Sequence, residues 1–146
     1  MIFSKSFGYA LRGVLYVALL QDEKEKVQIR EIAARLAIPR HFLAKIMKTL
    51  VKEGILSSTK GPYGGFCANE KTRDTTLAEL SLITNNNKEQ NICALRFRKC
   101  SSTNPCPLHD QIQEMQRNQQ SLMEGTTIGE LLQKDKNIFI RSITSI

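Results

Sequence analysis

The sequence of 146 residues predicts a mainly α-helical fold with one small β-hairpin. Apolar residues recur at helical spacing in three segments between residues 7 and 53. A turn rich in glycine and proline, KGPYGG at residues 60–65, separates two short runs with strand character. A long amphipathic segment follows Pro107. We therefore expect helices, a hairpin and a further long helix, in that order.

The first helix is expected at residues 7–20, with Ser6 as its N-cap. Its apolar positions recur at helical spacing: Leu11, Val14, Leu15 and Ala18. A charged loop at residues 22–26 follows. Val27 and Ile29 flank one polar residue, which predicts a one-rung strand.

Two further helices are expected at residues 30–37 and 39–53, with Gly54 as the stop of the second. They separate at Ile38-Pro39 because the residue before proline avoids helical backbone. So short a connection predicts a helix-turn-helix. One face of the second helix carries the apolar residues Phe42, Leu43, Ile46, Met47 and Leu50, and the outer face carries Arg40, His41, Ala44, Lys45 and Lys48.

The chain after the hairpin shows three more helical signals. Thr76 and Glu79 form a capping box, which predicts a helix at residues 77–83. A helix at 107–124, ended by Gly125, carries a narrow apolar stripe that suits a seam between two helices better than a core face. The stripe consists of Leu108, Ile112, Met115 and Leu122. Residues 127–130 cap a short helix, and the tail past Lys136 is expected to form a strand or a docking arm.

Composition excludes several classes of protein. The longest apolar run has seven residues, at 14–20, which is too short to span a membrane, and no cleavage site for a signal peptide follows it. We therefore expect a cytoplasmic protein. Neither a nucleophile motif, nor a phosphate loop, nor a dinucleotide fingerprint is present in the sequence, so we expect no enzyme.

Charge and element order together point to nucleic acid. The net charge is +7, and residues 40–60 hold five cations against one anion. A helix-turn-helix followed by a hairpin is the order of a winged helix, in which one helix enters the DNA major groove and the hairpin tip reaches the minor groove or backbone. Lys60 and Tyr63 lie at the expected tip, beside the outer face of residues 39–53. The alternative is a solvated basic face on a structural helix.

Three cysteines and a histidine lie close together, as Cys93-x6-Cys100-x5-Cys106-x2-His109. Thiolates in a loop can hold an iron–sulfur cluster. A structural zinc site usually has ligand pairs two to four residues apart, so these gaps are long for zinc. Redox-active thiols without a metal are a third option. The spacing leaves all three open, and His109 is either a fourth ligand or a surface residue.

The hairpin sequence KGPYGGF at residues 60–66 and the junction CPLHD at 106–110 resemble those of the IscR/NsrR-type family of bacterial transcription regulators, which also includes RirA and CymR. The resemblance extends over almost the whole chain. It implies a homodimeric winged-helix repressor or activator, in which the long helix crosses its partner and the cysteine loop lies near the dimer interface. The family's residues fall on Cys93, Cys100, Cys106 and His109 for the cluster, on Arg40, His41, Phe42 and Lys45 for the DNA groove, and on Lys60 for the wing.

Two departures from that family concern the cluster. The first gap between cysteines has six residues where the family usually has five. Some relatives recruit an acidic ligand from the first helix, where this sequence has Gly8 and Arg12. The resemblance therefore favours His109 as fourth ligand and a 2Fe–2S cluster over 4Fe–4S, and Cys67 is expected to be a small buried residue.

The sequence thus predicts a DNA-binding regulator of near-palindromic operators that senses iron–sulfur, redox or nitric oxide status through a cluster. Three parts are expected: a winged helix-turn-helix at 1–83, a cysteine-rich loop at 84–106, and a dimerisation helix with a C-terminal segment at 107–146. Two alternatives remain open. One is a cluster-free regulator controlled by thiol oxidation, a metabolite or a protein partner, as in CymR. The other is an interaction module stabilised by zinc.

Overall fold

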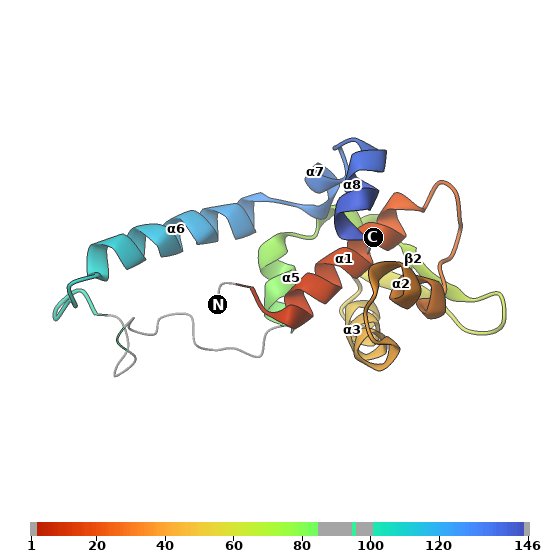
Figure 1. Cartoon of the computed structure of the whole chain (residues 1–146), viewed down its shortest axis with the longest axis horizontal. Helices are drawn as coiled ribbons and strands as arrows, with labels where there is room; N and C mark the ends of the chain where they lie inside the picture. Colours follow the sequence, from red (N-terminus) through yellow and green to blue (C-terminus); the bar gives the residue numbers. More distant parts are fainter. Residues whose placement is uncertain (1–2, 85–94, 96–100, 145–146) are drawn as a thin grey trace.

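The computed structural model describes residues 3–84, 95 and 101–144 (Figure 1). Its elements in chain order are α1 (Lys5–Leu19), α2 (Ile29–Leu36), α3 (Arg40–Lys52), β1 (Leu56–Thr59), β2 (Gly65–Ala68), α4 (Glu70–Asp74), α5 (Leu77–Thr84), α6 (His109–Gly125), α7 (Ile128–Leu131) and α8 (Lys136–Ile143). The predicted class, mainly helical with one small antiparallel hairpin, is confirmed.

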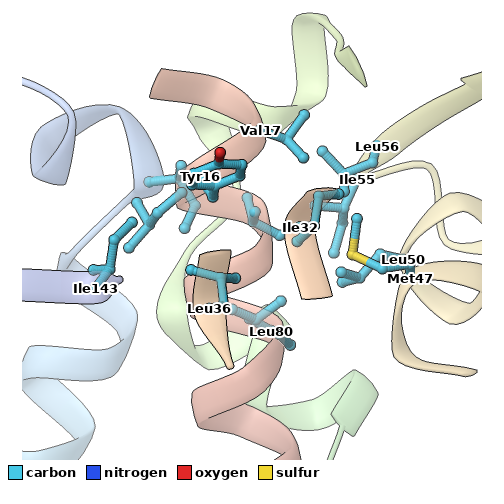
Figure 2. Packing of buried hydrophobic residues seen from close by; sticks show 14 of the residues in the cluster. Tyr16, Val17, Ile32, Leu36, Met47, Leu50, Ile55, Leu56, Leu80 and Ile143 are labelled. Atoms are coloured by element: carbon cyan, nitrogen blue, oxygen red, sulfur yellow. The ribbon is translucent and has the colours of Figure 1, made fainter. Parts of the chain in front are cut away.

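Helix α1 forms the centre of the core, where it contacts α2, α3, α5, α8 and β2. Its buried side chains meet those of α2, α3, α5 and the start of the hairpin (Figure 2). Gly13 allows α3 to pack closely, because a Cβ at this position would lie 3.2 Å from the Sδ of Met47. This packing fixes α3 from behind and leaves its other side at the surface.

The hairpin pairs β1 with β2 in an antiparallel register that sets Leu56 opposite Ala68. Val27 adds the predicted single rung: its N–H and C=O each bond Phe66, at 2.9 and 2.8 Å. Ile29, predicted to belong to this rung, is instead the first residue of α2. Gly65 makes the contact possible, because it has φ +146° and a Cβ there would lie 2.7 Å from the carbonyl oxygen of Val27.

The N-cap of α1 and the presence of α4 differ from the sequence prediction. Ser4 caps α1 instead of Ser6, and its Oγ accepts a hydrogen bond from the N–H of Phe7 at 3.0 Å. Helix α4 was not predicted, because its residues are all polar. It is capped by Asn69, whose side chain bonds the backbone inside the helix while Thr72 bonds back to the N–H of Asn69. The capping box between Thr76 and Glu79 is confirmed, with distances of 3.1 and 3.3 Å.

The C-terminal tail forms helix α8, so the predicted strand is wrong. Asp135 caps it by accepting from the N–H groups of Asn137 and Ile138. Phe139, Ile140 and Ile143 all pack against the core, at the spacing of one helix face, whereas a strand would turn the adjacent Phe139 and Ile140 to opposite sides. The other predicted form of the tail was a docking arm. Helix α8 agrees with it, because it packs on α1.

Helix α6 leaves this core and extends far to one side (Figure 1). Its C-terminal end is anchored, since Met123 is buried and α5 packs beside it. The chain then returns to the core: the N–H of Leu77 bonds the carbonyl of Thr126 at 3.0 Å, and the N–H of Ile128 bonds the carbonyl of Thr75 at 2.9 Å. The result is a compact body with one projecting helix.

Candidate nucleic-acid interface

Helix α3 presents a basic outer face because its apolar stripe is narrow. Leu43, Met47 and Leu50 are buried at spacings of four and three residues. Arg40, His41, Lys45 and Lys48 are all exposed, on a surface that the core does not use.

Phe42 corrects the sequence prediction for the buried face of this helix. It was grouped with the core residues, yet it is 51% exposed, because it lies one position outside the stripe that begins at Leu43. Its ring packs on that of His41, with centroids 4.2 Å apart and planes tilted by 38°. The outer face therefore begins with a cation followed by two rings in contact.

The turn before α3 is unusual in its backbone. Ala37 has φ 53° and ψ 44°, the left-handed conformation that glycine adopts more easily. Ile38 is buried and anchors the turn to the core. Together these residues set the angle at which α3 leaves α2.

The tip of the hairpin projects into solvent beside this face. Lys60 is exposed and Tyr63 is 92% exposed, as expected for residues that contact a partner rather than the core. The side-chain amide of Gln28, just before α2, donates to the carbonyl of Pro62 at 3.0 Å. The tip is thereby held at a fixed position relative to α2.

A groove of ≈ 510 Å³ lies between the hairpin and the N-terminal ends of α2 and α3. Arg40 lines it together with residues 28–30 at the start of α2, and the hairpin contributes Gly61, Pro62 and residues 64–66. A second groove of ≈ 480 Å³ shares Gln28, Arg30, Pro62 and Gly64 with the first and adds Lys24 and Lys26. The two grooves thus lie next to one another where the start of α2 meets the hairpin, and together they are called the basic channel below.

Lys24, Lys26 and Arg30 are site candidates that sequence reasoning missed. The sequence predicts residues 22–26 as a solvated charged loop. In the folded chain Lys24 and Lys26 lie beside the hairpin. The acid in the channel is Glu31, and it pairs with Lys24 at 2.5 Å. This pair raises the pKa of Lys24, mainly through the hydrogen bond to Glu31, so Lys24 remains charged. The open cations of the channel are therefore Lys26, Arg30 and Arg40.

The structure places half of the predicted metal-ligand set. Cys106 and His109 are both half-buried at the start of α6, and the N–H of His109 donates to the carbonyl of Cys106 at 3.0 Å. Cys93 and Cys100 lie outside the described residues. Within the described ranges no group of three or more candidate ligands comes together. Cys67 stands apart on β2, half-buried and opposite Ser57.

The predicted seam on α6 is largely open. Leu108, Met115 and Leu122 are 47%, 46% and 51% exposed, and Ile112 is half-buried. They lie along the projecting helix and contact the core little. Among the described helices, none is long and apolar enough to span a membrane.

The fold combines a helix-turn-helix with a β-hairpin wing, and an exposed basic face extends over both. This combination defines a winged helix-turn-helix protein. The chain belongs to the Rrf2 family, whose sequence model, described as an iron-dependent transcriptional regulator, matches residues 3–134. It is therefore a transcriptional regulator of this family, a role that is not enzymatic.

Relatives and solved structures agree with this assignment. A protein of Aquifex aeolicus named "Putative HTH-type transcriptional regulator" is 37% identical over 142 residues, which make up 95% of this chain and 97% of that protein. The regulator NsrR of Geobacillus kaustophilus is 29% identical over 126 residues, 86% of this chain and 85% of its own.

Two solved structures share the fold. CymR, the global cysteine regulator of B. subtilis, superposes with a TM-score of 0.71 at 16% identity, covering 91% of this chain and 97% of its own. T. potens IscR superposes with a TM-score of 0.66 at 18% identity, covering 90% and 85%. At such identities the likeness establishes the fold alone.

Proposed function

We propose that this regulator binds near-palindromic DNA as a homodimer and that an iron–sulfur cluster controls its affinity for DNA. The basic channel between α3 and the wing is the observation that carries the DNA-binding part. The cysteine–histidine set at the start of α6 supports the cluster.

DNA docking follows from the positions of α3 and the hairpin. A helix fits the major groove, which is about 12 Å wide, and the hairpin tip then faces the adjacent minor groove. Phosphates of the strand that separates these two grooves must pass between α3 and the wing. The channel lies at this place, with Arg30 and Arg40 on its walls. Sugar–phosphate contacts there would set the register of α3, whose His41, Phe42 and Lys45 then face base edges.

Lys60 and Tyr63 complete the proposed interface from the wing. Lys60 supplies a phosphate or minor-groove contact, and Tyr63 offers an exposed ring and a hydroxyl at the tip. Because Gln28 bonds the tip through Pro62, these wing contacts are placed relative to α2 and so to the helix-turn-helix.

Dimerisation is proposed along α6. Its exposed stripe of Leu108, Ile112, Met115 and Leu122 is apolar, and burying it against the same stripe of a second copy removes it from water. A two-fold dimer presents two copies of α3, so the operator repeats its half-site as a near-palindrome, with centres about 34–36 Å apart or a multiple of that distance.

The donor chemistry of the described pair fits a cluster. Cys106 and His109 offer a thiol and an imidazole within one turn, and Cys93 and Cys100 supply two further thiolates from the preceding sequence. A bound cluster would supply a redox- and nitric oxide-sensitive centre. The chain's own contribution is to connect these ligands directly to α6, so that ligation orders the start of the proposed dimer helix. The fourth ligand is His109, which favours a 2Fe–2S cluster.

Anaerobic purification followed by iron and sulfide analysis tests the cluster, and operator binding by holo-protein and chelator-treated protein at one salt concentration tests control. We expect brown protein and different affinities of the two forms. Colourless protein that binds DNA would support the cluster-free alternative, and zinc without DNA binding would support the interaction module. Equal affinities of both forms for every operator would make a bound cluster structural only.

A further inference from the structure

Arg12 in the middle of α1 joins two helix ends that lie far apart in the sequence. Its Nε donates to the carbonyl oxygen of Ile143 at 2.9 Å, and its Nη2 donates to the carbonyl oxygen of Leu36. Leu36 is the last residue of α2 and Ile143 is the last residue of α8. Neither ion pair of the described residues involves Arg12. Within the described part of the chain, two backbone carbonyls and no carboxylate therefore hold this half-buried guanidinium.

The electrostatics of helix ends explain the arrangement. The last carbonyls of a helix have no partners within the helix, and the C-terminal end carries a partial negative charge. At Arg12 two such ends meet on one cation. The planar guanidinium presents several N–H donors in a fixed fork and so serves both carbonyls at once, which a lysine ammonium does not do in the same geometry. One side chain of α1 thus bonds the C-terminal ends of both α2 and α8.

Leu36 directly precedes the left-handed Ala37, the single non-glycine residue with positive φ in the described part of the chain. A residue with a Cβ adopts this conformation at a cost in free energy, so contacts from outside must support the turn. The bond from Arg12 holds the carbonyl next to it. Three residues after Ala37, α3 begins at Arg40, and its direction follows from this turn.

Helix α8 is connected to the projecting helix by a short path. The chain leaves α6, is bonded to the start of α5 through Thr126 and Ile128, and reaches α8 after α7. The N-terminal end of α8 is tied to the loop after α1 by an ion pair between Lys136 and Glu23 at 2.6 Å. Its C-terminal end is tied by Arg12. The chain that follows the proposed dimer helix α6 therefore leads to α8, whose C-terminal end shares Arg12 with the end of α2.

We propose that Arg12 is a positioning residue that makes the DNA-reading orientation of α3 depend on the docking of α8. This inference rests on the proposed DNA binding, but not on the cluster. Its physical content is specific: loss of the fork releases the carbonyl of Leu36, the strained turn at Ala37 relaxes, and α3 no longer meets the groove at the required angle.

The first experiment measures operator affinity for Arg12→Met, Ala37→Gly and the double variant, at one salt concentration and at a temperature where circular dichroism shows each to be folded. Arg12→Met should weaken binding about tenfold, which corresponds to ~1.4 kcal/mol. Ala37→Gly alone should change it less than about twofold, because glycine adopts the left-handed turn without support. The double variant should recover most of the affinity. Lys134→Met, which removes an exposed cation far from the fork, is the control for lost charge.

A merely structural role gives a different pattern. Arg12→Met would then lower only the melting temperature, or Ala37→Gly would stabilise both backgrounds equally without restoring affinity. Either result overturns the proposal. If Arg12→Met does not fold, Arg12→Lys replaces it, since it keeps the charge and loses the fork.

A second measurement does not require DNA and so separates this inference from the proposed function. Lys136→Ala loosens the far end of α8. In the wild-type background it should shift the amide NMR signals of Ala37 and Ile38, and in the Arg12→Met background it should leave them in place. Shifts in both backgrounds or in neither would show that Arg12 does not connect α8 to the turn. Failure of the wild-type protein to bind any DNA would contradict the proposed function alone.

Discussion

Helices α1 and α6 have similar lengths, 15 and 17 residues, but opposite surroundings. Nine residues of α1 are buried, and five other elements pack around it. In α6 only Met123 is buried, although the helix carries an apolar stripe of its own. The apolar surface of α1 is buried within the chain, whereas that of α6 stays largely at the surface, where the proposed dimer would bury it.

An amphipathic helix can either build the core of its own chain, as α1 does, or leave its apolar stripe available for association, as α6 does. Packing around α1 fixes the angle of α3 and the hairpin, so this helix determines the shape of the proposed DNA surface. The stripe on α6 contributes little to the fold of one copy. Fully burying one side chain such as Leu or Met contributes about 1.5–3 kcal/mol, so several half-exposed ones along α6 are a substantial reserve for association.

The largest expected effect comes from placing the same charge on both helices. Leu15→Glu puts a carboxylate at a position that is 3% exposed and should unfold the protein, since such changes cost more than about 4 kcal/mol. Ile112→Glu with Met115→Glu should leave the helical circular dichroism intact and yield a monomer by light scattering. A dimer that survives the double change on α6 would place the seam elsewhere.

The second effect concerns the segment before α6. Cys100→Ala should abolish the cluster, because two thiolates and one imidazole do not complete its ligand set. His109→Cys should retain a cluster with a lower reduction potential, because histidine ligation raises the potential relative to cysteine. Iron content and a redox titration measure both. The winged-helix part should keep its melting behaviour in either variant, since α1 does not depend on this segment.

A smaller effect is expected at the wing. Lys60→Ala should weaken binding to all DNA sequences and lower the slope of log affinity against log salt by about one. Arg30→Ala should do the same through the channel, whereas Lys52→Ala, on the exposed end of α3, serves as the matched control. A Lys60→Ala protein with unchanged affinity at several salt concentrations would remove Lys60 from the interface.

These regions also differ in how well the sequence predicts them. Local signals are sufficient where one segment decides its own structure, as for the α3 stripe from Leu43 to Leu50 or the capping box at Thr76. They are insufficient where a distant segment decides. Arg30 becomes a groove residue only because Val27 pairs with Phe66 and brings the hairpin alongside.

Other features escape the sequence for the same physical reason. Helix α4 has no apolar periodicity and is fixed by Asn69 and Thr72, whose side chains also bond Gly54, Ser57 and Ile55 in the hairpin region. Arg12 binds two backbone carbonyls. Because every residue has a backbone carbonyl, the sequence does not indicate which ones Arg12 will bind. Phe42 is exposed because the buried face of α3 begins one residue later, at Leu43. The five apolar residues of this helix do not by themselves show at which of them the buried face begins.

The smallest expected effect is the pH dependence of the ion pair that holds the start of α8. The hydrogen bond from Lys136, together with its charge, lowers the pKa of Glu23. A carboxyl whose pKa is lower in the folded state stabilises the fold above its unfolded pKa, about 4.3, and this contribution is lost as the pH falls through the folded pKa. The pair is exposed, so its contribution is small.

Glu23→Gln removes this titration and leaves the shape of the side chain nearly unchanged. Between pH 6 and about pH 3, the melting temperature of the wild type should therefore fall slightly more than that of the variant, and the two curves should converge at the acid end. Glu25→Gln, in the same charged loop, is the control for general acid destabilisation. Parallel curves for wild type and Glu23→Gln would mean that the ion pair does not tie α8 in solution, and the apolar packing of α8 together with Arg12 would then hold the helix against α1.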